Sequence, residues 1–281
     1  MKTTRRRSWG ELAAIAARLR FESHDIRSQL DATGHYAVEL AREFPFNIRL
    51  FRYTSRHFTR GPTWHEQLEL FLPLDGRVDL RMGEQTAQLA AGDLLIVDNM
   101  KPHHVVDHPG FDARVVVISF LPEFVYSLGS PTHDYTFLLP FYSKSERRVQ
   151  LVPHDDPCAE KLYRVIGQLL ASYFLHAPRR YREAACKAWL LVLLHELAER
   201  FHDNEIERSE FLRQRHLVRR FEKLFSHLHR AFAEPISLST AARLAAMSKA
   251  QFTRRFRQVA GMNFVAYVTH VRVAEAARLL K

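Results

Sequence analysis

The sequence contains little cysteine and no long apolar run, and both absences exclude classes of protein. Cys158 and Cys186 are the only cysteines among 281 residues, and they form no Cys-x-x-Cys pair. Two cysteines are too few for a disulfide framework or a structural zinc site, so we expect a reducing environment. No segment approaches ~18 uninterrupted apolar residues, and the apolar stretch after Arg7 is too short for the core of an export signal. The sequence therefore predicts a cytoplasmic protein without a membrane-spanning segment.

Signatures of catalysis are also missing. The chain has no glycine-rich phosphate loop, no nucleophile elbow with an ordered Ser-His-Asp set, and no paired carboxylates in a plausible cleft. His195 and His216 lie in expected helices without partners at ligand spacing, where a histidine is more often a surface or core residue than a ligand. We therefore expect a protein that is not an enzyme and that holds no cofactor.

Acidic residues are scarce near the C-terminal end. Residues 211–281 contain 14 Lys+Arg and 3 Asp+Glu, a net charge of +11, whereas residues 1–210 contain 27 and 28, a net charge of −1. The formal charge of +10 for the whole chain therefore comes from its last quarter. A compact basic module most often binds nucleic acid, although a solvated basic surface has the same composition.

Apolar periodicity divides the chain into parts of different character. The first part has Leu12, Ile15 and Leu19 at helical spacing, which predicts an exposed helical extension. The second part alternates with a period of two between turn residues, which is typical of an antiparallel barrel or sandwich. Its expected strands are 46–53, 64–74, 76–82, 86–89, 93–98 and 114–120. The four expected parts are residues 1–44, 45–121, 122–204 and 205–281.

The third part predicts two amphipathic helices, 155–177 and 182–202, joined tightly at Pro178. Their apolar faces could form a dimer interface or could simply close the core, and the pattern alone favours neither. The charged stretch 202–210 is the expected linker. The predicted fold class is α+β, with an antiparallel β-barrel and a helical dimerisation region followed by an all-α domain.

The basic part predicts a helix-turn-helix. Ser237 can cap a helix over 238–246, and Ser248 can cap a second helix with Gln251 at the spacing of a capping box. Gly261 supplies a helix stop. Two short helices joined by a turn of a few residues are the geometry of this DNA-binding motif.

The second helix of the motif has two distinct faces. The inward face is expected to hold Phe252, Phe256 and Val259, and the outward face Ala250, Thr253, Arg254 and Arg257. A small residue allows close approach to a major groove, Arg254 can form a bidentate pair with guanine, and Arg255 and Arg257 suit phosphates. The alternative is an exposed basic helix without a ligand, but the caps, the turn and the two faces together favour DNA binding.

The segment from Ser237 to Lys281 resembles the first helix-turn-helix and linker helix of the AraC/XylS family of transcription regulators. The matching residues are Met247, Ser248, Phe256, Gly261, Tyr267, Arg272, Ala276, Leu279 and Leu280. The resemblance implies that Ala250, Gln251, Thr253 and Arg254 face the groove of double-stranded DNA. Members of this family often activate transcription by contacting RNA polymerase, so the resemblance makes the polymerase a possible partner. A homodimer is expected from the apolar faces of the two helices in residues 155–202.

The sequence departs from the family pattern in two respects. Ala246 stands in the turn where the family usually has glycine, a position that is often left-handed and at which alanine costs on the order of 1 kcal/mol. Family members also carry a second helix-turn-helix after the linker helix, and this sequence reaches Lys281 where that motif would begin. We therefore expect weak, salt-sensitive DNA binding from a chain with one helix-turn-helix and robust specific binding from a chain with two.

The segment 63–76 carries a polar face, which is unusual for a strand facing a barrel interior unless that interior holds a ligand. Strand alternation places Trp64, Leu68, Leu70 and Leu72 on one side and His65, Gln67 and Glu69 on the other. With the run from Gly92 to Val97 and the later Pro102-His103-His104, this segment resembles the cupin barrel, which is the usual sensor of AraC/XylS regulators.

The cupin resemblance suggests a ligand site. Thr63 occupies the position of the first histidine of metal-binding cupins, while His65, Glu69 and His103 occupy the other three. Three such ligands could hold a divalent metal. The same residues with Gln67 could instead bind an organic effector such as a sugar, and the lost fourth ligand favours that interpretation over metal. His104 is expected to point away from the site.

Together these observations predict a transcription regulator controlled by a small-molecule effector in a cupin barrel. The alternative from another class is a metal-dependent cupin enzyme, a dioxygenase or isomerase, with an accessory helical tail. A structural adaptor is a third possibility, but it leaves the basic face of the second helix unexplained.

Overall fold

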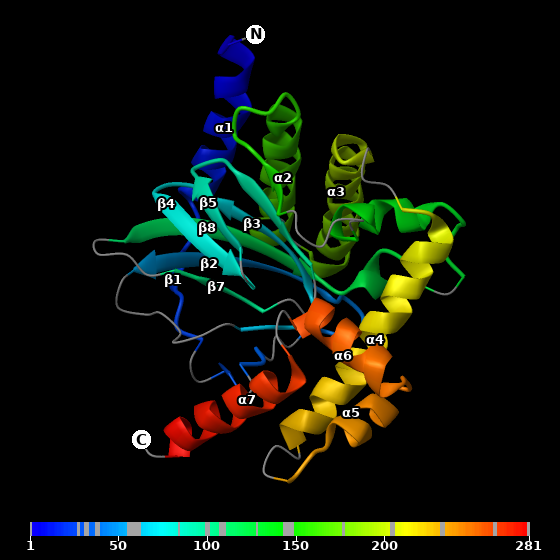
Figure 1. Ribbon diagram of the computed structural model, residues 1–281. Coiled ribbons are helices and arrows are strands. Elements are labelled where there is room, and N and C mark those ends of the chain that lie inside the picture. Colours follow the sequence, from blue (N-terminus) through cyan, green and yellow to red (C-terminus); the bar gives the residue numbers. More distant parts are fainter. Residues whose placement is uncertain are drawn as a thin grey trace.

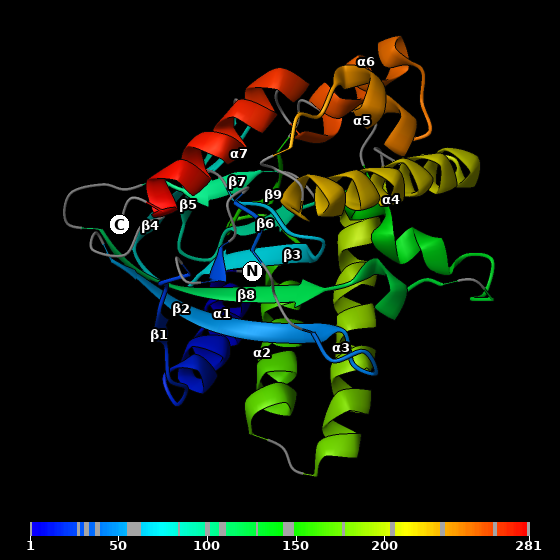
Figure 2. The same cartoon turned by 90° about the horizontal axis from the view of Figure 1, so that it is seen from below.

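The structure is a computed structural model of the chain. It describes residues 2–26, 29–30, 34–36, 40–54, 63–83, 85–98, 102–106, 111–127, 129–142, 149–175, 178–202, 206–230, 234–260 and 263–279. Two β-sheets form the middle of the molecule, with the α-helices of residues 2–200 on one side and those of residues 208–279 on the other (Figures 1 and 2). The fold is therefore α+β, with a sheet-rich N-terminal region and a helical C-terminal region, as predicted.

The sheets form a cupin-like barrel in which the paired strands are antiparallel except for β1 and β2, which are parallel. The larger sheet has the strand order β1-β2-β8-β3-β6-β9 and the smaller one β5-β4-β7. The strands are β1 (Glu22–Ser23), β2 (Phe46–Thr54), β3 (Leu68–Pro73), β4 (Arg77–Met82), β5 (Gln85–Ala90), β6 (Leu94–Val97), β7 (His103–Val105), β8 (Asp112–Phe120) and β9 (Gln150–Val152). All six predicted strands are present, and β1, β7 and β9 are additional.

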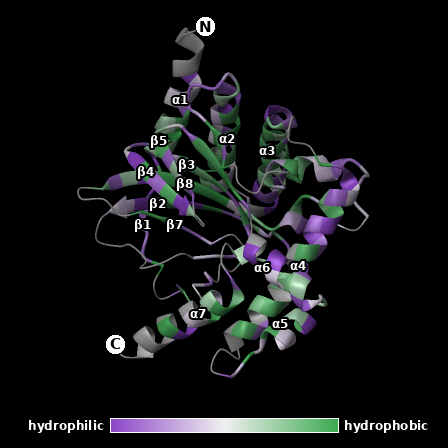
Figure 3. Cartoon of the chain, viewed as in Figure 1, coloured by the Kyte–Doolittle hydropathy of each residue, from purple (hydrophilic) through white to green (hydrophobic). Residues whose placement is uncertain are grey.

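The helices surround the sheets. The 3-10 helices η2 (Pro122–Phe124) and η3 (Asp134–Phe141) follow the barrel. The α-helices are α1 (Lys2–Ala16), α2 (Ala159–Phe174), α3 (Arg179–Arg200), α4 (Arg208–Arg230), α5 (Leu238–Leu244), α6 (Lys249–Ala260) and α7 (Phe264–Leu279). Green, hydrophobic segments concentrate where the large sheet meets α2 and α3, whereas α4 carries many hydrophilic residues (Figure 3).

Three hydrophobic clusters hold these layers together. The first lies between the large sheet and α1, α2, α3 and η3, and the second fills the barrel between the two sheets. The third is the core of the helix-turn-helix domain, formed by α4, α5, α6 and α7. The predicted stripe of α2 points into the first cluster, with Leu162, Ile166, Leu169 and Leu170 almost fully buried. These helices therefore do close the core.

The N-terminal part differs from the prediction of an exposed helical extension. Helix α1 ends at Ala16, and Leu12 and Ala16 are buried against α2. Downstream, Glu22 and Ser23 pair in parallel with Phe51 and Arg52 and extend the sheet. Helical periodicity identified the helix but not the tertiary contact that covers it.

The expected linker is also anchored at its end. Residues 203–205 lie outside the described part of the chain, but Ile206 and Phe211 are buried in the cluster between sheet and helices. The ring of Phe211 packs against Tyr126, Tyr135 and Tyr142 at centroid distances of 5.7, 5.4 and 4.9 Å. Helix α4 thus begins in contact with the sensor part and ends in the helix-turn-helix domain.

Candidate functional site: a polar barrel interior coupled to a helix-turn-helix

The barrel interior brings together three of the residues expected to bind a ligand. The Nε2 atoms of His65 and His103 lie 3.3 and 3.7 Å from Oε2 of Glu69. All three residues are buried, with 2%, 8% and 7% of their surfaces exposed. Ser119 on the neighbouring strand donates its hydroxyl to Oε1 of Glu69 at 2.8 Å. The carboxylate is therefore held on both oxygens.

Burial and the neighbouring charges shift the pKa of Glu69 in opposite directions. Burial alone would raise the pKa of this carboxyl, but the charges and hydrogen bonds of His65 and His103 outweigh burial and hold the pKa well below its usual range. Glu69 is therefore ionised in the folded protein, as a ligand or an ion-pair partner of the histidines must be.

The backbone fixes the positions of the histidines. Thr63 and His103 exchange backbone hydrogen bonds at 2.9 and 2.8 Å, and the Thr63 hydroxyl donates to the His103 carbonyl at 3.1 Å. The Nδ1 atom of His65 lies 3.1 Å from the carbonyl oxygen of Gln67, so Nε2 is directed toward Glu69. Thr63 and Gln67 therefore support the site in ways the sequence did not predict, and the side chain of Gln67 is not among those that line the cavity.

The cavity beside these residues is small. Its volume is about 50 Å³, and it is lined by Thr63, His65, Glu69 and His103 together with Tyr53 and other residues. His104, expected to point away, also lines it, and burial lowers the pKa of its imidazole. The space holds about one or two water molecules and falls well short of the ~300 Å³ of ordinary ligand pockets.

The sequence analysis missed several of the lining residues. Among them, His24, Ile26 and Tyr36 come from the N-terminal part of the chain. The His24 ring stacks on Tyr53 at 4.3 Å, and burial lowers its pKa to about 4. No local pattern marked these residues because their partners lie in strands far along the chain.

The donor set fits a divalent metal. His65, Glu69 and His103 offer two imidazole nitrogens and one carboxylate oxygen, all within 4.8 Å of one another. His65 already has the oriented second nitrogen that metal-binding histidines usually show. These three residues would hold such an ion, which would supply Lewis-acid chemistry at the barrel interior.

Trp64 links this site to the second domain. The predicted strand alternation grouped Trp64 with Leu68, Leu70 and Leu72, but β3 begins only at Leu68 and Trp64 belongs to a different cluster. Its ring lies 4.8 Å from Phe225 of α4 and 4.4 Å from His35, which bonds Glu66 at 2.9 Å. The residue between Thr63 and His65 thus packs into the core of the helix-turn-helix domain.

The helix-turn-helix follows the predicted local chemistry closely. Ser237 accepts from the backbone of Thr240 at 3.0 Å, and Ser248 and Gln251 exchange both bonds of a capping box at 3.3 Å. The first helix ends at Leu244, two residues earlier than predicted, and Gly261 lies outside the described residues. Ala246 adopts the left-handed conformation with φ 52°, which the usual glycine of this turn would accept without strain.

We expect Ala246→Gly to stabilise the helix-turn-helix domain by about 1 kcal/mol, because it removes the cost of the left-handed backbone. The free energy of unfolding, measured by urea denaturation, should rise. The matched control is Ala245→Gly, at a fully buried neighbour with φ −79°, which should destabilise the domain. A lower midpoint for Ala246→Gly than for the parent would contradict the expectation.

The recognition helix α6 has the two predicted faces. Phe252 and Phe256 are fully buried, and nothing is described of the Val259 side chain. On the other side Ala250, Gln251, Thr253, Arg254 and Arg257 are exposed, and Arg255 is half-buried. The Thr253 hydroxyl bonds the carbonyl of Lys249 at 3.0 Å, which leaves its methyl group outward.

Comparison with known proteins identifies similarities to both the barrel part and the helix-turn-helix part of the chain. Residues 50–119 match the model of the cupin domain family. The uncharacterized HTH-type transcriptional regulator YdeC of Bacillus subtilis is 21% identical over 259 residues, covering 89% of this chain and 82% of that protein. The chain is therefore similar to an HTH-type transcriptional regulator, and its residues 50–119 are similar to the cupin domain. The predicted resemblance is thereby confirmed.

Two solved structures accompany these matches. The unsaturated fatty acid bound ToxT of Vibrio cholerae has a TM-score of 0.50 at 11% identity, over 86% of this chain and 83% of that one. The AraC-like transcriptional activator CuxR has a TM-score of 0.35 at 10% identity, over 75% and 67%. Among the described residues, no helix is long and apolar enough to cross a bilayer.

Proposed function

We propose that this chain is a DNA-binding transcription regulator whose DNA affinity is controlled by a small-molecule effector. The observation that carries the proposal is the exposed, small and basic face of α6, presented by a helix whose opposite face is packed into a capped helix-turn-helix core. Such a helix can enter a major groove, with Arg254 reading a base edge and Arg257 neutralising a phosphate.

The route of control runs through Trp64. A ligand that moves His65 or the Thr63–His103 bridge also moves the indole that packs on Phe225. Phe225 in turn contacts Phe256 of the recognition helix at 5.7 Å. The effector would change DNA affinity to the extent that it binds one arrangement of the two domains better than the other.

The effector is proposed to be organic and to enter from the covered side of the barrel. A sugar-sized molecule exceeds the 50 Å³ cavity, so its binding requires the segment with His24, Ile26 and Tyr36 to move away. ToxT has been solved with an unsaturated fatty acid bound, so an organic ligand within a related fold has precedent.

Dimerisation, contact with RNA polymerase and a cytoplasmic location remain predictions. For the dimer, Phe174, Tyr181 and Val192 of α2 and α3 and the α2 cap residue Leu175 are at least 38% exposed, although the same helices close the core. We propose that two chains associate through these side chains. Sedimentation of the chain and of a Val192→Glu variant tests this: a monomeric parent would contradict it.

The function is tested with duplexes selected from a random-sequence library by the full chain. We expect Arg254→Ala to weaken binding to the selected site by roughly 1–3 kcal/mol and to relax the preference at one base pair. Arg257→Ala should instead weaken selected and random duplexes alike and lower the salt slope by about one. Failure to enrich any sequence, or unchanged binding by Arg254→Ala, would refute the proposed role of α6.

A metal-dependent cupin enzyme is the second candidate, and the cluster of His65, Glu69 and His103 is the observation in its favour. Metal analysis of the purified chain separates the two candidates. A stoichiometric ion that is lost in Glu69→Gln would support the enzyme, whereas a metal-free parent that binds DNA would support the regulator.

A further inference from the structure

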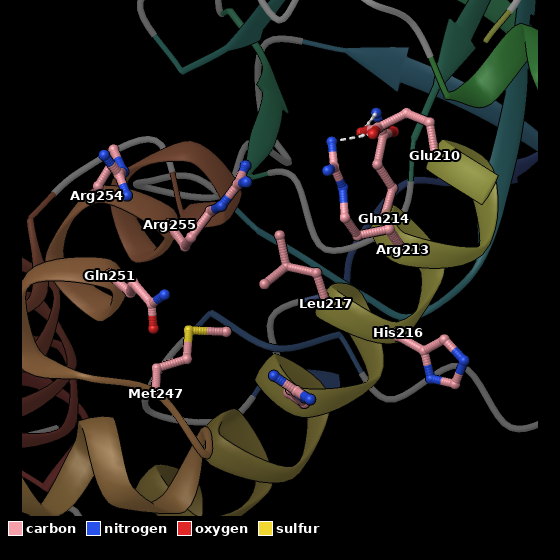
Figure 4. Close-up of a pocket in the computed structure, with 10 residues that line it drawn as sticks. Glu210, Arg213, Gln214, His216, Leu217, Met247, Gln251, Arg254 and Arg255 are labelled. Atoms are coloured by element: carbon pink, nitrogen blue, oxygen red, sulfur yellow. Dashed lines mark hydrogen bonds and ion pairs between the residues drawn. The ribbon is translucent and has the colours of Figure 1, made fainter. Parts of the chain in front are cut away.

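A basic groove of about 560 Å³ lies between α4 and α6 (Figure 4). Its lining residues are Glu210, Arg213, Gln214, His216, Leu217, Arg220, Met247, Gln251, Arg254 and Arg255. Four arginines face one glutamate, so the groove carries positive charge. In Figure 4, Arg254 and Arg255 extend from α6 above Gln251, while Arg213 and Gln214 rise from α4 opposite them.

Helix α4 has three faces, and the groove uses the one that neither domain covers. Phe211, Arg215 and Arg219 recur every four residues and contact the sensor part, where both arginines bond Glu123 at 2.8 and 2.7 Å. The apolar seam that includes Phe221 packs into the helix-turn-helix core. Arg213 and Arg220, seven residues apart, share the remaining side and are exposed.

The groove lies beside the outward face of α6. At 100° per residue, Gln251 stands about 100° and Arg255 about 140° around the helix from Ala250, and Arg254 stands about 40° from Ala250 on the same side. An α-helix with side chains is about as wide as a major groove, roughly 12 Å, so its flanks face the phosphate backbones when its outward face meets the bases. The α4 arginines are therefore on the side where one DNA strand would pass.

We propose that Arg220 and Arg213 of α4 bind DNA phosphates beside the recognition helix. This inference rests on the proposed function and extends its DNA-binding surface beyond the helix-turn-helix. The charge is continuous with that of α6 through Arg254 and Arg255, which line the groove. A continuous basic surface follows a DNA backbone, whereas a small anion needs only one enclosed site.

The two α4 arginines differ in whether a neighbouring carboxylate already pairs with them. Among the residues that the structure describes, Arg220 has no ion-pair partner, whereas Arg213 pairs with Glu210. The same carboxylate accepts from Gln214 at 3.0 Å. Glu210 therefore competes with a phosphate for Arg213, and Arg220 should contribute more to DNA binding.

The bonds from α4 to Glu123 also connect the barrel domain to the proposed phosphate-binding arginines. Because Arg215 and Arg219 join α4 to Glu123, a movement of Glu123 would be transmitted to the helix that carries Arg213 and Arg220.

The test is fluorescence anisotropy of the full chain on a random-sequence duplex over a series of salt concentrations. We expect Arg220→Ala to lower the slope of log affinity against log salt by about one and to weaken binding several-fold at low salt. Arg220→Lys should restore the slope because it keeps the charge. Glu210→Gln should change affinity in the opposite direction and strengthen binding. The matched control is Arg164→Ala on α2, an exposed arginine far from the groove, which should leave the slope unchanged.

The outcomes separate this inference from the proposed function. If the parent does not bind duplex DNA at all, the proposed function fails and the inference fails with it. If the parent binds but Arg220→Ala and Glu210→Gln both leave the slope and affinity unchanged, only the inference is wrong. Saturable binding of inorganic phosphate that Arg220→Ala abolishes, with an unchanged duplex slope, would also overturn it and assign the groove to a small anion.

Discussion

Trp64→Ala should cost about 3–5 kcal/mol and should uncouple the unfolding of the two domains. Trp64 is 3% exposed, and it is the barrel residue among the described members of the helix-turn-helix core. Removing its ring leaves a cavity against Phe225 and His35. Urea unfolding followed by circular dichroism should show one transition in the parent and two in the variant.

The control for this change is Trp189→Ala. Trp189 packs at the edge of the cluster between sheet and helices, away from the contact between domains. Its removal should lower stability without separating the transitions. A Trp64→Ala protein that still unfolds in one step, and whose DNA affinity still responds to effector, would show that the indole does not couple the domains.

Glu69→Gln should lower the free energy of unfolding by about 3 kcal/mol near neutral pH, because it removes one partner from a buried, charged cluster. Burial tends to raise the pKa of Glu69, but His65 and His103 hold it well below its ordinary value. A carboxyl with a depressed pKa stabilises the fold above its unfolded pKa, and this contribution is lost as the pH falls through the folded pKa. The difference between parent and variant should therefore be largest above about pH 4.5 and should shrink below it.

The measurement is urea denaturation of both proteins at several pH values. Ser119→Ala removes the hydroxyl that bonds the other carboxylate oxygen and leaves the charge in place, so it serves as the matched control. It should cost about 1 kcal/mol with a weaker pH dependence. A gap between parent and Glu69→Gln that widens on acidification would contradict the role assigned to the carboxylate.

The helix-turn-helix could be predicted almost completely from the sequence because its determinants are local. The caps at Ser237 and Ser248 bond residues three positions away, and the burial of Phe252 and Phe256 follows from helical spacing. Even the strained backbone of Ala246 was evident from a departure at one turn position.

The barrel site could be predicted only in part. Its polar residues stood out because His65 and Glu69 interrupt an apolar strand, but the bounds of that strand were wrong. Alternation was extended back to Trp64, whereas the strand begins at Leu68, so the role of the indole in the other domain was missed. His24 was missed because its partner Tyr53 lies in a strand that no short-range pattern connects to it.

The length of helix α4 fixes how the helix-turn-helix domain is rotated relative to the barrel domain. Its 23 residues run without a break from the Arg215 and Arg219 contacts to the buried Leu224 and Leu228. Each inserted residue would rotate one end against the other by about 100° and lengthen the helix by about 1.5 Å. The surface loops can change length freely, but this helix cannot, because its length decides the direction from which Arg254 approaches DNA.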